Sequence, residues 1–210
     1  MSNLSPHLDQ TDDSRRTPAG TGVHDEWSGI RHGDGTEPPL GFDTVNRPRP
    51  VVRSFAFLDL CESTAFFEDE GAHQALDLVT EFRNMVRETT ARRGVRVAKW
   101  IGDGAMLVGV DSGPVIATCV ELCARMRSST LQLRAGVSVS TALPFDGDDY
   151  LARGANFASR LCNMANEGET LCDSDCREDI PTWVDVIEER SVEAKGMGEH
   201  TVLVLDWSQN

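Results

Sequence analysis

Four polar residues in three parts of the chain have the chemistry of a phosphoryl-transfer site. Asp59 follows a run of β-branched and aromatic residues, and Asp103 lies between two glycines at the turn between two apolar runs. Asn156 and Arg160 are one helical turn apart in a segment that opens a helix. Carboxylates hold Mg²⁺, while an amide and a guanidinium stabilise charge on a phosphate. The spacing therefore favours a site for two metal ions and a phosphorylated substrate.

The elements that must position these residues follow the order strand, helix, strand, strand, helix, strand. Their expected ranges are 51–60, 65–93, the two arms of a hairpin over 95–110, 112–129 and 131–140. This order is typical of the α+β ferredoxin-like βαββαβ core, an antiparallel sheet with helices on one face. The first strand then lies beside the hairpin, which brings Asp59 and Asp103 to the same edge of the sheet.

The rest of the chain adds further elements to this core. They are expected as a loop over 145–149, a helix over 151–167, and strands near 184–188 and 201–205. After Asp59 the chain runs into the start of a helix, where free backbone N–H groups at Ser63 and Thr64 favour phosphate.

Three motifs match, in order and spacing, the catalytic domain of class III adenylate and guanylate cyclases. They are Phe-x-Asp ending at Asp59, a strand lysine (Lys99) four residues before Asp103, and Asn-x-x-x-Arg from Asn156 to Arg160. The resemblance extends from about residue 51 to 205. It implies a catalytic domain over 51–207 that converts ATP to 3′,5′-cyclic AMP and pyrophosphate in intracellular signalling.

The resemblance also implies roles for residues near metal and phosphate. Asp59 and Asp103 resemble the two aspartates that bind two Mg²⁺ or Mn²⁺ ions per site. Lys195, in a Lys-Gly-Met-Gly turn, resembles a lysine that contacts phosphate, and Ser63 and Thr64 lie in the segment that corresponds to the phosphate-binding loop.

Other residues resemble those that bind the nucleoside. Lys99 and Asp149 stand where the family reads the adenine base, and Asn156 and Arg160 where it orients the ribose and stabilises the transition state. The family splits these residues from the metal aspartates across a head-to-tail homodimer. Because this chain holds both sets, a symmetric dimer could have two sites.

Departures from the family pattern leave two alternatives open. Glu62 replaces a common glycine, Ser63 replaces a common aromatic residue, and Met197 replaces a second lysine. One alternative is a pyrimidine nucleotide cyclase of antiphage signalling; the other is a cyclase-like module that binds nucleotide without turnover. A diguanylate cyclase is set aside, because its Gly-Gly-Asp/Glu-Glu-Phe turn is absent from the sequence.

Composition and charge indicate which partners and which location to expect. The formal net charge of −14 argues against binding to nucleic acid or an anionic membrane. No segment has the roughly 20 apolar residues of a membrane span, and we expect a cytoplasmic protein. Residues 1–50 are rich in Ser, Thr, Asp, Gly and Pro and are expected to be a disordered tail. The six cysteines are expected as reduced, packed thiols.

Overall fold

The structure is a computed structural model that describes residues 48–146 and 149–208. The tail expected over 1–50 therefore lies outside the described residues except for its last three. The described elements are, in chain order, β1 (Val51–Leu60), α1 (Ser63–Glu70), α2 (Ala72–Arg93), β2 (Arg96–Ile101), β3 (Gly104–Gly109), α3 (Ser112–Met126), β4 (Leu133–Phe145), β5 (Asp149–Ala152), α4 (Arg153–Met164), β6 (Thr170–Asp173), the 3-10 helix η2 (Ser174–Asp179), β7 (Val184–Ala194) and β8 (Gly198–Trp207).

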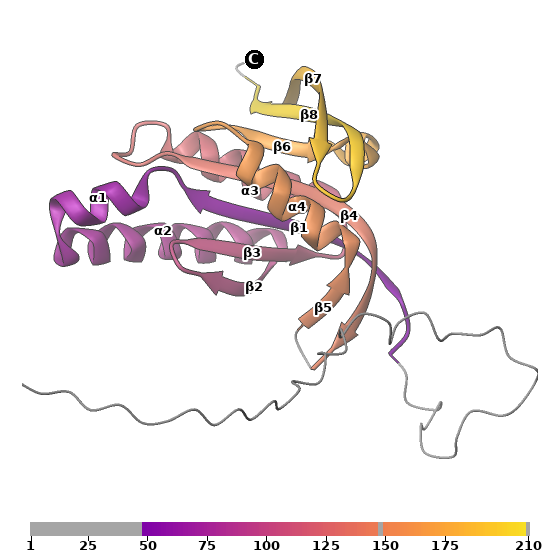
Figure 1. Cartoon of the computed structure of the whole chain (residues 1–210), viewed down its shortest axis with the longest axis horizontal. Helices are drawn as coiled ribbons and strands as arrows, with labels where there is room; N and C mark the ends of the chain where they lie inside the picture. Colours follow the sequence, from indigo (N-terminus) through magenta and orange to yellow (C-terminus); the bar gives the residue numbers. More distant parts are fainter. Residues whose placement is uncertain (1–47, 147–148, 209–210) are drawn as a thin grey trace, which may run out of the picture. The chain divides into compact units, whose positions relative to one another are not determined.

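The strands form one eight-stranded sheet, and β1 lies near its centre (Figure 1). The order is β2-β3-β1-β4-β6-β8-β7, and β5 pairs with β4 outside this path. Strand β1 is antiparallel to both β3 and β4, whereas β6 runs parallel to β4. The first four strands and two long helices therefore have the predicted βαββαβ arrangement, and the α+β fold class is confirmed.

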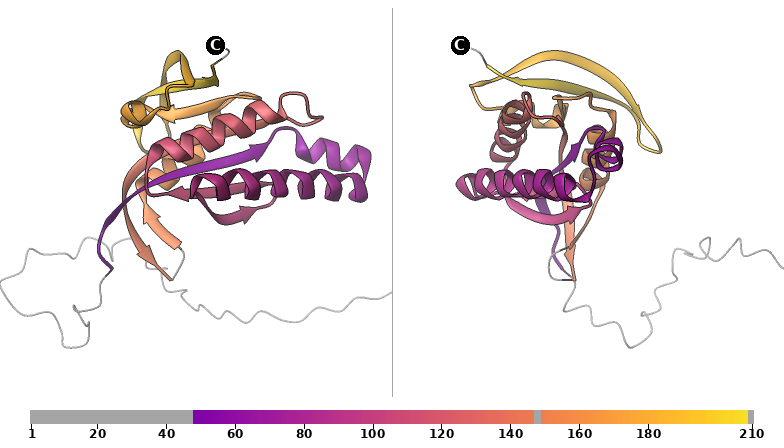
Figure 2. Two further views of the ribbon diagram at one scale, coloured as in Figure 1. Left: turned by 180° about the vertical axis from the view of Figure 1, so that it is seen from behind. Right: turned by 90° about the vertical axis from the view of Figure 1, so that its left-hand side faces the viewer.

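Helices cover both faces of the sheet. Alternate side chains of β1 point to opposite faces: Leu58 packs in a cluster with Phe82 of α2 and Ile116 of α3, whereas Phe55 packs in another with Ala158 of α4. Helices α2 and α3 thus lie on one face and the added helix α4 on the other, as the front view of Figure 1 and the rear view of Figure 2 show. Helix α4 sits very close to β4, because a Cβ on Gly136 would be 2.2 Å from the Cys162 nitrogen.

The structure corrects several element boundaries. The helix expected over 65–93 is two helices, because Gly71 between them has φ 86° and ψ 171°, an extended positive-φ conformation that glycine tolerates and that interrupts the helix. The expected loop and helix start near residue 150 contain strand β5, which pairs with the end of β4. Strand β6 escaped prediction because its four residues are all buried and show no alternation.

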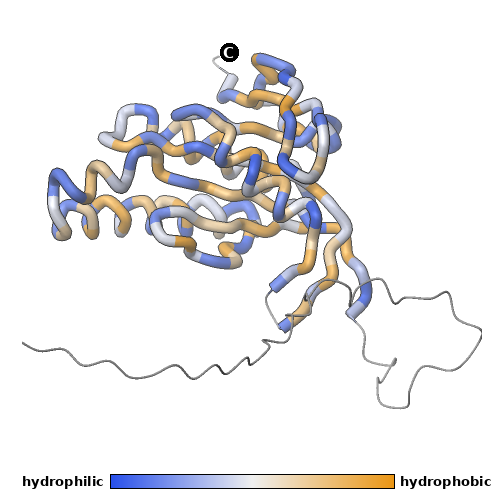
Figure 3. Tube along the Cα trace, viewed as in Figure 1, coloured by the Kyte–Doolittle hydropathy of each residue, from blue (hydrophilic) through white to orange (hydrophobic). Residues whose placement is uncertain are grey.

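Burial follows the hydropathy of the sequence. Figure 3 shows hydrophobic residues along the central strands and hydrophilic residues at the exposed ends of the helices. All six cysteines are buried free thiols, as predicted. Among the described residues, no helix is long and apolar enough to cross a membrane.

Candidate active site

Strand pairing brings Asp59 and Asp103 to one edge of the sheet. Leu58 of β1 pairs with Ala105 of β3, so the next pair along is Asp59 and Gly104, and Asp103 directly precedes Gly104 in the turn. A Cβ on Gly104 would lie 2.4 Å from the Leu58 carbonyl oxygen and 3.5 Å from Asp59 Oδ1. Only glycine at position 104 lets the hairpin approach β1 this closely, and this approach places the turn that carries Asp103 at the same edge of the sheet as Asp59.

Arg134 of β4 is a site residue that sequence reasoning missed. It lies opposite Asp59 in the β1–β4 register, and its Nε and Nη2 donate to Asp59 Oδ2 at 3.0 and 2.5 Å. Because Arg134 donates these hydrogen bonds to the Asp59 carboxylate, the pKa of its guanidinium is raised. Only the strand register reveals this pair, since the two residues are 75 positions apart.

The two oxygens of Asp59 therefore have different surroundings. Oδ2 accepts both bonds from Arg134, whereas Oδ1 accepts no hydrogen bond from the described residues and faces the Gly104 backbone. One oxygen is thus left open on the side of the hairpin turn. The Asp103 carboxylate likewise has no hydrogen-bond or ion-pair partner within the described part of the chain. Two acids with unused oxygens at one edge are a donor set suited to a hard divalent cation.

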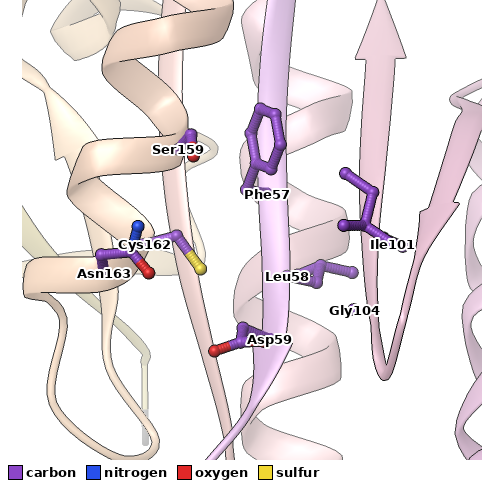
Figure 4. Close-up of a pocket in the computed structure, with 9 residues that line it drawn as sticks. Phe57, Leu58, Asp59, Ile101, Gly104, Ser159, Cys162 and Asn163 are labelled. Atoms are coloured by element: carbon purple, nitrogen blue, oxygen red, sulfur yellow. The ribbon is translucent and has the colours of Figure 1, made fainter. Parts of the chain in front are cut away.

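A cavity of about 290 Å³ opens beside Asp59, between β1, the hairpin and α4. Figure 4 shows Cys162 of α4 directed toward Asp59 across this space, with Ser159 and Asn163 on the same helix. Burial, followed by the negative charge of Asp59, raises the pKa of the Cys162 thiol to about 12. This thiol is therefore neutral at physiological pH. Of the two side chains, Asp59 is the one that brings a carboxylate to the cavity.

A second cavity, of about 420 Å³, contains the polar residues of α4 that the sequence singled out. Asn156 and Arg160 line it together with Arg153, and the turn between β7 and β8 closes its other side at Gly196 and Met197. Arg160 Nη1 is buried and has no hydrogen-bond partner. A buried guanidinium nitrogen without a partner is costly in a folded protein and indicates a position for an anionic ligand.

Lys99 and Asp149 contact each other. Lys99 Nζ of β2 lies 2.5 Å from Asp149 Oδ2 of β5, and the Tyr150 backbone N–H donates to Asp149 Oδ1 at 2.9 Å. The bond from Lys99, and then that from Tyr150, lowers the pKa of the Asp149 carboxyl. Neither side chain lines the cavity of Asn156 and Arg160, so the two residues expected to read the base form a separate part of the surface.

The three residues expected to contact phosphate, Ser63, Thr64 and Lys195, line neither the cavity beside Asp59 nor the cavity beside Arg160. Ser63 and Thr64 begin α1, which starts directly after Glu62. Glu62 has φ 55°, which is a left-handed conformation that favours glycine, so the substitution noted in the sequence leaves a strained backbone here. Lys195 is exposed at the β7–β8 turn, next to Gly196 of the Arg160 cavity.

The sheet edge with Asp59 and Asp103, here called the metal edge for the role expected of it, lies on a different side of α4 from the Arg160 cavity. Residues 159, 162 and 163 of α4 line the Asp59 cavity, whereas residues 153, 156 and 160 line the other. With 3.6 residues per turn, the centres of these two sets are about 100° apart around the helix. Within the described residues, no group of three or more His, Cys, Asp or Glu could hold a metal ion. The two acids and the two polar residues of α4 therefore lie at two separate places on one chain, called the two half-sites below.

Comparisons with known proteins give relatives in sequence and in structure. No protein-family model matches the chain. An uncharacterised protein of Mycobacterium tuberculosis is 33% identical over 135 residues, which are 63% of this chain and 35% of that protein. A pH-sensitive adenylate cyclase of the same species is 31% identical over 142 residues, 66% of this chain and 35% of its own. The chain thus spans about a third of the length of the curated relatives it matches.

Solved structures with similar folds are nucleotide cyclase domains. The catalytic core of a rhodopsin-guanylyl cyclase with converted specificity, in complex with ATPαS, has a TM-score of 0.67 and 14% identity, and the match covers 75% of this chain and 97% of that one. An adenylyl cyclase of Pseudomonas aeruginosa has a TM-score of 0.63 and 20% identity, over 77% and 97% of the two chains. The chain therefore has the fold of the class III adenylyl and guanylyl cyclase catalytic domains, which its sequence motifs resemble.

Proposed function

We propose that the chain is a nucleotidyl cyclase that converts ATP to 3′,5′-cyclic AMP and pyrophosphate. The observation that carries this proposal is the pairing of two half-sites on one cyclase fold. One has two carboxylates with unused oxygens at a sheet edge, and the other has the buried, unpartnered Arg160 Nη1. Together they supply the positive and negative charges that phosphoryl transfer from a nucleoside triphosphate requires.

The reaction forms one bond and breaks another at the α-phosphorus. The ribose 3′-oxygen attacks this atom, the bond to the bridging oxygen of the β-phosphate breaks, and pyrophosphate leaves while the 3′-hydroxyl loses its proton. Asp59 and Asp103 would hold two Mg²⁺ or Mn²⁺ ions, which when bound favour the ionised 3′-hydroxyl and neutralise charge on the triphosphate. The open Oδ1 of Asp59 and the unpartnered carboxylate of Asp103 fit this role.

Arginine and asparagine on α4 would act on the other side of the reacting phosphate. Arg160 donates to the phosphate oxygens as negative charge develops on them, and Asn156, one turn earlier on the same helix, orients the ribose. Lys195, at the exposed turn beside this cavity, adds positive charge near the triphosphate. These roles need no rearrangement of the helix, since both side chains already face one cavity.

Lys99 and Asp149 would select adenine. Lysine offers only donors and an ionised aspartate only acceptors, which matches the ring nitrogen and the amino group of adenine. Their mutual contact of 2.5 Å keeps the two side chains adjacent on β2 and β5. A guanine base would instead place its carbonyl against Asp149, and that mismatch disfavours GTP.

The direct test is to incubate the purified chain with each of the four nucleoside triphosphates and Mn²⁺ and to identify products by mass spectrometry. We expect cyclic AMP and pyrophosphate in equal amounts from ATP, and none from the Asp103→Asn variant. Cyclic UMP or CMP as the main product would favour a pyrimidine cyclase. Absence of any cyclic product would favour a module that binds nucleotide without turnover.

A further inference from the structure

The turn that carries Asp103 is held by a residue outside both half-sites. Arg83 of α2 donates from Nη2 to the carbonyl oxygen of Gly102 at 3.1 Å. Gly102 directly precedes Asp103 and has φ 59°. Since the Asp103 carboxylate has no partner of its own among the described residues, its position depends on the backbone of this turn. The bond from Arg83 is therefore a direct restraint on where that carboxylate lies.

Arg83 is itself held in place by Trp100 of β2. Its guanidinium carbon lies 5.0 Å from the centroid of the Trp100 ring, within the range of a cation–π contact. Trp100 meets Phe82 of α2 edge to face at 6.4 Å, and Phe82 is in the main hydrophobic core. This packing connects the turn to the core through Arg83. Arg83 Nε is buried and has no hydrogen-bond partner. The contact with Trp100 and the bond to Gly102 therefore hold the side chain in a conformation in which one of its donors is unsatisfied.

Arg87, one helical turn later, provides a natural comparison. Its guanidinium carbon lies 5.1 Å from the same Trp100 ring. However, Arg87 Nη1 donates to Asn84 Oδ1 at 3.2 Å, and among the described residues Arg87 makes no hydrogen bond to the turn at Gly102. The two arginines therefore share charge, helix and aromatic partner, and they differ in the hydrogen bond to Gly102.

We propose that Arg83 is a positioning residue for the metal edge: it fixes the turn at Gly102 and thereby keeps Asp103 beside Asp59. The proposal rests on the function proposed above, in which these two acids hold divalent ions. A charged donor makes a strong hydrogen bond to a carbonyl, and residues that orient a metal ligand typically change metal affinity or activity about 10- to 100-fold when they are lost.

The test compares Arg83→Ala with Arg87→Ala in the full chain, by two measurements that need no turnover. Hydrogen exchange followed by mass spectrometry reports the opening of the peptide over residues 99–107. Titration with Mn²⁺ alone, followed by electron paramagnetic resonance, reports metal affinity, with Asp103→Asn as the reference for a lost ligand. We expect Arg83→Ala to speed exchange of this peptide and to weaken Mn²⁺ binding about tenfold, while Arg87→Ala stays within about twofold of the wild type.

Two outcomes overturn the proposal, and they have different meanings. When Asp103→Asn weakens Mn²⁺ binding but Arg83→Ala behaves like Arg87→Ala, the metal edge stands and Arg83 does not position it. When Asp103→Asn leaves Mn²⁺ binding unchanged, the metal assignment of the proposed function fails, and the role of Arg83 fails with it. Should an alanine variant not fold, as judged by circular dichroism, Arg83→Met and Arg87→Met provide the same comparison, because methionine keeps a long apolar stem and has no N–H donor.

Discussion

Among the single residues of the site, Asp59 and Asp103 differ in how they are held. Asp59 is anchored through Oδ2 by two bonds from Arg134, while Asp103 is positioned only by its turn. Replacing Asp59 would therefore also leave the Arg134 guanidinium without this partner. Asp103 has no such partner among the described residues, so its substitution tests the proposed metal edge with the least structural disturbance.

Replacing Asp103 by Asn should therefore remove activity and keep the fold. We expect turnover of ATP at saturating Mn²⁺ to fall at least about 100-fold, because a neutral amide is a poor ligand for a hard cation. The melting temperature should stay close to that of the wild type, since no partner is lost. Initial rates and calorimetry measure both effects, with Asp69→Asn on the exposed α1 as the control. Retention of more than a tenth of the activity would contradict the metal assignment.

The buried carboxyl of Asp173 predicts a pH-dependent stability. Asp173 is 7% exposed, accepts from Ser138 Oγ at 2.8 Å and from the Asp175 backbone N–H at 3.2 Å, and burial raises its pKa. Because its pKa is higher in the folded than in the unfolded state, the folded protein binds the proton of Asp173 more tightly, and this stabilises the fold. The stabilisation is fully present below the unfolded pKa of about 4 and is lost as the pH rises through the folded pKa.

The Asp173→Asn variant lacks this titration and can still accept from Asp175 and donate to Ser138. Its free energy of unfolding, relative to the wild type, should therefore increase as the pH rises from about 3.5 to 7. Urea denaturation of both proteins across this range measures the difference. A difference that is constant with pH, or that decreases, would show that burial does not govern this carboxyl.

At the level of elements, periodicity and turn chemistry predicted the ferredoxin-like core. Strand β1 agrees with prediction at both ends, and the Gly-Asp-Gly turn of the hairpin lies where expected. Elements without a local sequence pattern were not predicted. Strand β6 is uniformly buried and shows no alternation, and β5 forms because it pairs with the end of β4. The break between α1 and α2 depends on one glycine inside a helical pattern, which sequence alone does not separate from a tolerated interior glycine.

The candidate site likewise contains some residues that local sequence patterns predict and others that only the three-dimensional fold reveals. Residue types and spacing singled out Asp59, Asp103, Asn156 and Arg160, because each stands at a strand end, a turn or a helix face. Arg134 and Arg83 could not be found this way, since their contacts depend on strand register and on the packing of α2 against β2.

Strands β2 and β5 are not paired in the sheet, but their side chains Lys99 and Asp149 meet, and this contact underlies the prediction on base selection. Lys99→Glu combined with Asp149→Cys reverses the pattern of donors and acceptors, so we expect ATP turnover to fall and the ratio of GTP to ATP turnover to rise by at least about tenfold. Rates with both nucleotides at matched Mn²⁺ measure the ratio. The single Lys99→Glu variant is the control, because it places two carboxylates together and should lower both rates. A wild type that prefers UTP or CTP would overturn the adenine assignment.

For the molecule as a whole, the separation of the two half-sites suggests that a site forms between two chains. The cavities beside Asp59 and Arg160 lie on different sides of α4, so one chain does not bring the acids and the arginine to one phosphate.

The hairpin of β4 and β5 extends away from the rest of the sheet (Figure 1) and exposes Leu143, Phe145 and Leu151. Apolar side chains on an extended hairpin are suited to contact a second copy of the chain. We therefore propose a head-to-tail homodimer with two sites.

Mixing two inactive variants tests this arrangement. In a heterodimer of Asp103→Asn with Arg160→Ala, one site carries both substitutions and the other carries neither, so a one-to-one mixture with random exchange should recover about a quarter of the wild-type activity per total protein. Mixing Asp103→Asn with Asp59→Asn is the matched control and should recover nothing, because every site then lacks a metal ligand. Activity is measured as cyclic AMP formed, and heterodimers are counted by native mass spectrometry. Equal recovery in both mixtures, or none in the first although heterodimers have formed, would exclude a site shared between two chains.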